Sequence, residues 1–323
     1  MRTILTLALL TLAVGGAAHS QSGILPVPAL GYVHDKEGRS LRPILGIPGA
    51  ATVGEPIPLP FSITLAVVAP RLDCTLVRTG DTSKVVLIRN LGREISWTEI
   101  DGVSAEVDQI VLSNSGRSAA VYAGAAVHVI GGLPDNPAVM RTVDVAGVPV
   151  RAMAVSDDGR LLAAAIANET DDVLRVNDAD TGAWKDLGPS GRVTSVAFAR
   201  NGRDLAVSAD GPAAVSLIRQ IESAAEWRPV LGEADGLVSP AAVRFAGDSR
   251  LLIATAGGVI VAQLSDNSRV ELKCGCTPTV LEELDSGSTF RLTDFSREPI
   301  WILHDSEEGA RLLFVPPPEV RVQ

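Results

Sequence analysis

The side chains of this sequence that could carry chemistry are few and lie far apart. The most unusual spacing is Cys274-Gly275-Cys276, and the third cysteine, Cys74, lies far upstream. A single intervening glycine would strain a disulfide between Cys274 and Cys276, and strained disulfides are the most easily reduced. The pair therefore predicts a structural clip, a redox-active disulfide or two thiols, whereas Cys74 is expected to be a buried thiol. We expect no metal there, because the C-x-x-C spacing is missing and no histidine lies near the pair in sequence.

Carboxylates gather in one segment, where Glu169, Asp171 and Asp172 fall between two predicted strands. Asp210 occupies the corresponding place one repeat later. Such a loop can form a rim that binds a cation or a polar ligand. The alternative is ordinary solvated turn chemistry, since charged side chains are mostly exposed and an acidic chain must place them in loops.

A second candidate set, Asp108 and Arg151, lies at the starts of predicted first strands, as does Thr194. In a closed ring of strands, these positions would border the mouth of a central channel. The set holds one acid and one base but no repeated acidic residue. Three histidines are spread over the chain after the first twenty residues: His34, His128 and His304. They show no triad pattern and no G-x-S-x-G motif occurs, so we assign no catalytic residue.

A repeated strand–turn–strand unit positions these residues. Its best-formed copy is 193–209, VTSVAFARNGRDLAVSA, with a turn at 200–202. The turn glycines Gly116, Gly159 and Gly202 are spaced by 43 residues, and glycine suits a short hairpin because it adopts a positive φ without strain. Two further short strands follow each unit. Four strands in a period of this length are typical of a β-propeller blade. The other copies of the unit are 65–77, 107–122, 150–165, 241–255 and 280–293.

The segments 197–203, AFARNGR, and 155–160, VSDDGR, resemble the strand–turn–strand motif of WD-repeat and YVTN-type propellers. The resemblance covers about residues 60–315 and implies an all-β propeller. The sequence departs from the family pattern, because no Trp-Asp dipeptide ends a third strand, no Gly-His opens a blade and the turn proline is missing. The resemblance therefore implies the fold and no functional residue. Most of the four tryptophans fall on predicted fourth strands, which predicts packing between outer strands.

The number of blades follows from the residues outside the six copies. They leave room for a seventh four-stranded antiparallel blade, to which 31–35 and 41–47 would contribute strands that join the chain ends and so remove free sheet edges. The alternative is six blades with an extra N-terminal hairpin. We therefore divide the chain into a signal peptide over 1–20, an N-terminal arm over 21–60 that includes a proline-rich linker at 48–60, and propeller repeats over 61–323.

The N-terminus predicts export. Arg2 precedes an apolar run over 4–14 and then small residues, which is the pattern of a signal peptide cleaved before Gln21. We expect a periplasmic or extracellular protein with no membrane span after cleavage. The net charge of −10 argues against nucleic acid or an anionic membrane as a partner, because both attract basic surfaces.

The sequence predicts a non-catalytic propeller that binds an unknown protein partner or small ligand and needs no cofactor. The alternative is a propeller-type hydrolase of the lactonase kind, which would need acids and a histidine at the channel mouth. A quinone-dependent dehydrogenase is disfavoured, because its tryptophan-bearing blade motif is not seen. Since a propeller is a scaffold for many functions, the fold alone does not choose between these classes.

Overall fold

Short apolar runs separated by glycine-rich and polar turns form strands throughout the chain. The computed structural model describes residues 28–70, 74–103, 107–285, 287–296 and 298–318, in which the regular structure is 27 strands and one short 3-10 helix, η1 (Glu233–Asp235). The signal peptide predicted over 1–20 lies outside these residues. No helix among the described residues has the length and apolar character needed to cross a bilayer.

The strands pair into seven antiparallel sheets, each built from strands that are consecutive in sequence. The first three sheets contain β1 (Ala29–Asp35), β2 (Ser40–Ile47) and β3 (Ala50–Val53); β4 (Ile63–Val68), β5 (Cys74–Thr79), β6 (Val85–Arg89) and β7 (Ser96–Glu99); and β8 (Val107–Leu112), β9 (Ala119–Ala123), β10 (Ala126–Gly131) and β11 (Ala138–Asp144).

The next two sheets contain β12 (Val150–Val155), β13 (Leu161–Ile166), β14 (Val173–Asp178) and β15 (Trp184–Pro189); and β16 (Arg192–Phe198), β17 (Leu205–Asp210), β18 (Ala214–Arg219) and β19 (Glu226–Gly232). The last two contain β20 (Ala242–Ala246), β21 (Arg250–Thr255), β22 (Gly258–Gln263) and β23 (Arg269–Lys273); and β24 (Glu282–Glu283), β25 (Thr289–Arg291), β26 (Ile300–Ser306) and β27 (Gly309–Val315).

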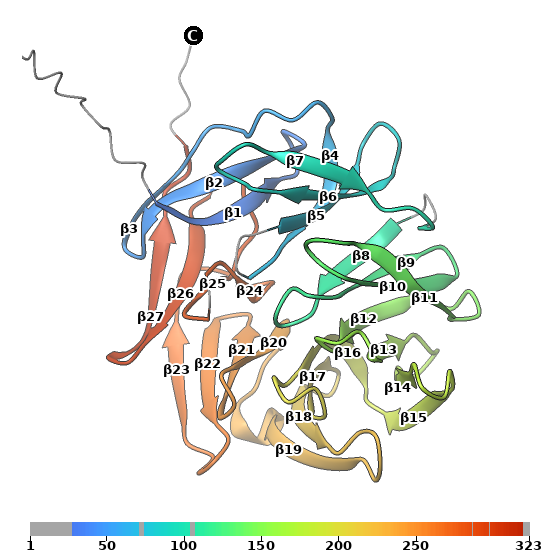
Figure 1. Cartoon of the computed structure of the whole chain (residues 1–323). Coiled ribbons are helices and arrows are strands. Elements are labelled where there is room, and N and C mark those ends of the chain that lie inside the picture. The colour runs from blue at the N-terminus through green and yellow to red at the C-terminus, as the bar shows by residue number, and fades with distance from the viewer. Residues whose placement is uncertain (1–27, 71–73, 104–106, 286, 297, 319–323) are drawn as a thin grey trace, which may run out of the picture.

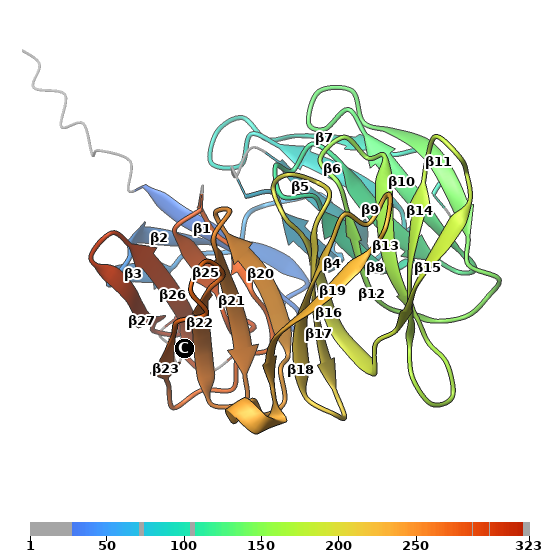
Figure 2. The same cartoon turned by 90° about the horizontal axis from the view of Figure 1, so that it is seen from below.

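The seven sheets are the blades of a β-propeller. They follow one another around a ring, with the first strand of each blade toward the axis and the last strand at the rim (Figure 1). Seen from the side, the strands run from one face of the ring to the other (Figure 2). The predicted seven blades are confirmed and the six-bladed alternative is wrong, because the N-terminal strands form a blade of their own rather than an extra hairpin.

The core consists of seven apolar layers, and each layer lies between two neighbouring blades. The middle strands explain the high alanine content: β13 (LLAAAI) is buried at every position, since it is covered on both faces by adjacent blades. Small side chains allow blades to approach closely, so interior packing stays dense. The ring therefore has seven separate apolar layers rather than one central hydrophobic core.

The ring closes through side-chain packing between the first and last blades. Leu30, Ile44 and Ala51 of the first blade pack with Ile300 and Val315 of the last. β27 pairs only with β26 among the described strands, so the closing blade contains only N-terminal strands. It extends further than expected from sequence, because β3 falls inside the segment 48–60 that we expected to be a linker.

The turns and the rim follow sequence expectations. Gly116, Gly159 and Gly202 have φ of 71°, 71° and 66°, which is the left-handed conformation that the hairpins require. On the outer strands, Trp184 Nε1 donates to the Asp144 carbonyl of the preceding blade (3.2 Å). Trp227 Nε1 likewise donates to the Leu187 carbonyl (2.8 Å). These two tryptophans therefore join neighbouring outer strands.

Candidate binding site in the central channel

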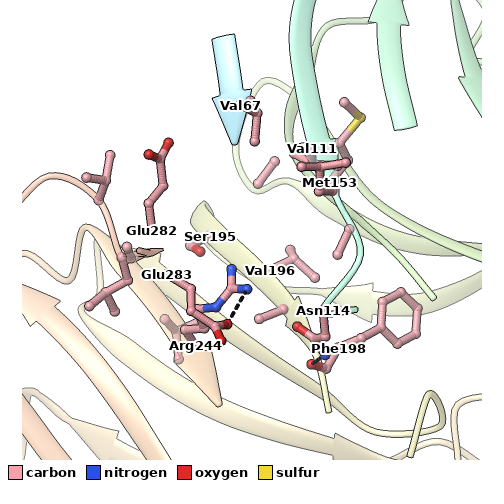
Figure 3. A pocket seen from close by; sticks show the side chains of 18 of the residues that line it. Val67, Val111, Asn114, Met153, Ser195, Val196, Phe198, Arg244, Glu282 and Glu283 are labelled. Atoms are coloured by element: carbon pink, nitrogen blue, oxygen red, sulfur yellow. Dashed lines mark hydrogen bonds and ion pairs between the residues drawn. The ribbon is translucent and has the colours of Figure 1, made fainter. Parts of the chain in front are cut away.

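The first strands of six blades surround a cavity of about 300 Å³ on the ring axis. They are β4, β8, β12, β16, β20 and β24, whose lining side chains are drawn in part in Figure 3. A propeller places its innermost strands side by side around the axis, so residues far apart in sequence meet there. Residues that differ between the repeats can therefore form a binding site in the channel.

One side of the cavity is apolar along its middle, whereas Gln109 and Arg151 line it where β8 and β12 begin. It is formed by β4, β8 and β12, whose Val67, Val111 and Met153 line the channel (Figure 3). Ile110 and Ala152 complete this wall. These strands keep the apolar character that the repeat pattern predicts, and they offer a surface that favours the burial of hydrocarbon.

The other side carries an ion pair at mid-channel. Arg244 on β20 donates from Nη2 to Glu283 Oε2 on β24 at 3.2 Å. The two side chains are only 21% and 12% exposed, and Ser195 of β16 lines the same cavity (Figure 3). Burial raises the pKa of Glu283 above its ordinary value, in part offset by the positive charges of Arg244 and Arg200. This wall therefore presents a guanidinium, a carboxyl and a hydroxyl to the same space.

A second carboxylate, Glu282, also lines the channel but pairs elsewhere. Arg291, which is 5% exposed, donates to Glu282 Oε2 from Nη2 at 2.6 Å and from Nε at 3.1 Å. The same guanidinium donates to Asp294 (2.8 Å), whose carboxylate also binds Lys36 of the first blade (2.5 Å). Burial would lower the pKa of Arg291, but the two carboxylates hold it above its ordinary value. This network links the last blade to the first.

Hydrogen bonds between blades fix the two ends of the channel. At the end where the first strands begin, Gln109 Nε2 donates to the Arg151 carbonyl at 3.2 Å and Thr194 Oγ1 donates to the Pro240 carbonyl at 2.7 Å. At the other end, Asn114 Nδ2 donates to the Phe198 carbonyl at 2.7 Å. The channel wall is therefore held at both ends by bonds that bridge separate blades.

Of the six candidate ligand-rim residues, only Arg151 lines the channel. Its Nε donates to Asp172 Oδ1 at 2.7 Å, and Asp172 Oδ2 accepts the backbone N–H of Val193 at 2.8 Å. Asp172 is 1% exposed. It joins β12, the loop before β14 and the first strand of the next blade, so its observed contacts are structural.

The other four candidates lie away from the cavity. Asp108, Glu169 and Asp210 are exposed and Asp171 is partly exposed, and none lines the channel. Asp108 shares the strand position of Arg151, but its neighbour Gln109 is the side chain that reaches across to the next blade. The structure thus does not bring the predicted acidic rim together around one space.

Sequence reasoning missed Arg244 and Glu283. Their signal is charge inside a first strand, as a single arginine in AAVRFA and as two adjacent glutamates in VLEELD. Alignment of the repeats emphasises the turns, where the copies agree, whereas these residues stand where the copies differ. The pair forms only when neighbouring blades place β20 and β24 side by side.

The cysteines lie outside the channel lining. The structure joins Cys274 and Cys276, just after β23, by a disulfide with a Cα separation of 5.1 Å. Cys74 begins β5 and is fully buried. Within the described residues, no group of three His, Cys, Asp or Glu side chains is placed to hold a metal ion.

Comparison with solved structures supports the seven-bladed fold. A functionally unknown protein from Desulfotomaculum acetoxidans is 12% identical with a TM-score of 0.60, over 89% of this chain and 99% of that one. A hydrazine synthase chain from Kuenenia stuttgartiensis is 14% identical with a TM-score of 0.59, over 94% and 99%. A candidate 6-phosphogluconolactonase from Bacteroides uniformis is 13% identical with a TM-score of 0.58, over 91% and 97%.

At these identities the similarity establishes the fold alone. No known sequence family and no curated protein matches the chain. The resemblance to WD-repeat and YVTN-type propellers therefore rests on the turn motif, and the three similar structures, with their different descriptions, do not choose a function for this chain.

Proposed function

We propose that the protein is an exported, non-catalytic binding scaffold that receives a small ligand, or a segment of a protein partner, in its central channel. The observation that carries this proposal is that the channel wall presents an apolar patch of Val67, Val111 and Met153 on one side and Arg244, Glu283 and Ser195 on the other. Concave sites of this composition are the usual places for ligands, because apolar surface supplies affinity and a few polar groups fix orientation.

The state of the charged groups favours binding over hydrolysis. Each charged side chain on the channel wall already has an ion-pair partner: Arg151 with Asp172, Arg244 with Glu283, and Glu282 with Arg291. A general base needs a lone pair directed at the proton it removes. The lining residues also include no histidine, so the acid and histidine set expected of a lactonase-like site is not assembled there.

Export and partner class complete the proposal. The N-terminal pattern supports secretion, and N-terminal sequencing of the mature protein should begin at Gln21. The acidic net charge of −10 supports a partner other than nucleic acid or an anionic membrane. Recovery of the uncleaved chain from the cytoplasm would refute the export part of the proposal.

A photo-crosslinking residue placed in the exported protein tests the channel as the binding site. Substitution at Val111 puts the crosslinker in the channel, and substitution at Met140, which is 57% exposed on the rim strand β11, provides the matched control. We expect adducts of a small molecule or peptide at Val111 and none at Met140, identified by mass spectrometry. Adducts at Met140 alone would assign binding to the rim and refute the channel proposal.

A further inference from the structure

We propose that the channel recognises a carboxylate carried on a small apolar body. The carboxylate binds Arg244 and Ser195, and the apolar body lies against Val67, Val111 and Met153. This inference rests on the proposed function and names the ligand chemistry of the same site.

Arg244 has donors to spare for such a ligand. A guanidinium carries five N–H groups in a planar fork that matches a carboxylate. Within the described residues, only one hydrogen bond of this side chain is made to protein, from Nη2 to Glu283. Ser195, whose hydroxyl makes no described hydrogen bond, lines the same cavity as Arg244 (Figure 3). Together they can offer two or more donors to one incoming carboxylate.

The rest of the cavity sets the size and polarity of the ligand. Opposite the guanidinium, Val67, Val111 and Met153 form the apolar wall (Figure 3). A volume of about 300 Å³ is at the lower end of the range for small-molecule sites. The site therefore suits a short aliphatic or aromatic acid, or the last residue of a chain with a free C-terminus.

Binding of an anion should be coupled to protonation of Glu283. The groups that act on this carboxyl are Arg244 on β20, Arg200 after β16 and Asp285 after β24. Burial already raises the pKa of Glu283, and a second carboxylate beside it raises that pKa further because like charges repel. When Glu283 takes up a proton, it releases Arg244 to the ligand. Affinity should therefore increase as the pH is lowered.

The carboxylate could belong to a free small acid or to the C-terminus of a peptide, and the choice of probes distinguishes the two. Isothermal titration calorimetry on the mature protein uses hexanoate, hexan-1-ol, a peptide ending in leucine with a free carboxylate, and the same peptide amidated. We expect hexanoate to bind at least about tenfold more tightly than hexan-1-ol, since a hydrogen bond to a charged group is worth more than a neutral one. Binding of hexanoate alone indicates a free acid, whereas preference for the free-acid peptide over its amide indicates a C-terminus.

Variants test the assigned residues. Arg244→Gln should weaken hexanoate binding at least about tenfold, whereas Glu283→Gln should tighten it and remove its pH dependence. Arg269→Gln, on a surface strand with 44% exposure, is the matched control and should change nothing. The double variant Arg244→Gln/Glu283→Gln keeps a neutral hydrogen-bonding pair, so it should remain folded by circular dichroism and still lose binding.

The outcomes separate this inference from the proposed function. If hexan-1-ol binds as tightly as hexanoate, or if Arg244→Gln binds hexanoate like the wild type, the carboxylate assignment is refuted while the channel remains the binding site. If hexanoate does not bind the wild type but crosslinked adducts form at Val111, the ligand class alone is refuted. If no probe binds and adducts form only on the rim, both proposals fail.

Discussion

Replacement of Asp172 by alanine should destabilise the propeller, and this effect should be present in the unliganded protein. The carboxylate accepts the backbone N–H of Val193 at 2.8 Å and Nε of Arg151 at 2.7 Å, and Val193 is 4% exposed. An unsatisfied buried N–H costs about 1–3 kcal/mol. The ion pair adds only about 0.5 kcal/mol, because Arg151 is 39% exposed and solvent screens such pairs.

We therefore expect Asp172→Ala to lower the free energy of unfolding by about 1.5–3.5 kcal/mol. Asp172→Asn should cost about 1 kcal/mol, since the amide oxygen still accepts the Val193 N–H but the charge is lost. Equilibrium urea unfolding followed by tryptophan fluorescence measures the change. With an m-value of about 3 kcal/mol/M, the alanine variant should shift the midpoint by roughly 0.5–1.2 M.

The neighbouring acids provide matched controls. Asp171→Ala and Glu169→Ala remove carboxylates from the same loop, and each should change stability by less than about 0.5 kcal/mol. An unchanged midpoint for Asp172→Ala would show that the bridge between blades contributes nothing and would refute the structural role. Equal losses in all three variants would mean that the loop acts through its summed charge.

Three further predictions concern histidine, glycine and tryptophan. Burial lowers the pKa of His128, so below about pH 6.5 the unfolded chain binds more protons than the folded chain and stability falls. The melting temperature of His128→Phe should therefore depend less on pH between 7 and 5 than that of the wild type. An unchanged dependence would contradict this. Gly202→Ala should lower the free energy of unfolding, measured in urea, by about 1–2 kcal/mol, because φ at Gly202 is 66° and L-residues are strained there. The control Gly257→Ala should lower it much less, because Gly257 has open space around it and no positive φ. Trp227→Phe should lower the free energy of unfolding by about 1 kcal/mol, because it loses the 2.8 Å hydrogen bond to the preceding blade. Trp97→Phe on the exposed rim should be nearly neutral. Equal losses in the two variants would exclude the hydrogen bond as the cause.

The repeat could be predicted because turn chemistry is local. A positive φ at Gly116, Gly159 and Gly202 favours glycine in each turn, so the period remains visible in the sequence even where strand residues change. The first blade was harder to delimit. β3 (AATV) is short and stands among prolines, and nothing local separates a four-residue strand from a linker.

The site could not be predicted in the same way, because its residues meet only through the ring. Asp172 has the sequence context of a solvated loop, and it is buried only because Arg151 and Val193 converge on it. Arg244 and Glu283 come from different blades, and neither sequence segment shows that the other residue is its partner. Sequence patterns report the neighbours along a strand, whereas the channel is made by neighbours across strands.

The ion pair at mid-channel is difficult to explain by stability alone. Packing between blades uses the apolar faces of the sheets, so the ring does not need charges on its axis to close. Desolvation of Arg244 and Glu283 offsets much of their attraction, and apolar residues of similar volume are often equally or more stable in such places. β4, β8 and β12 show that apolar side chains are accommodated on this channel wall. The charges on the axis therefore support the proposal that Arg244 and Glu283 serve a ligand.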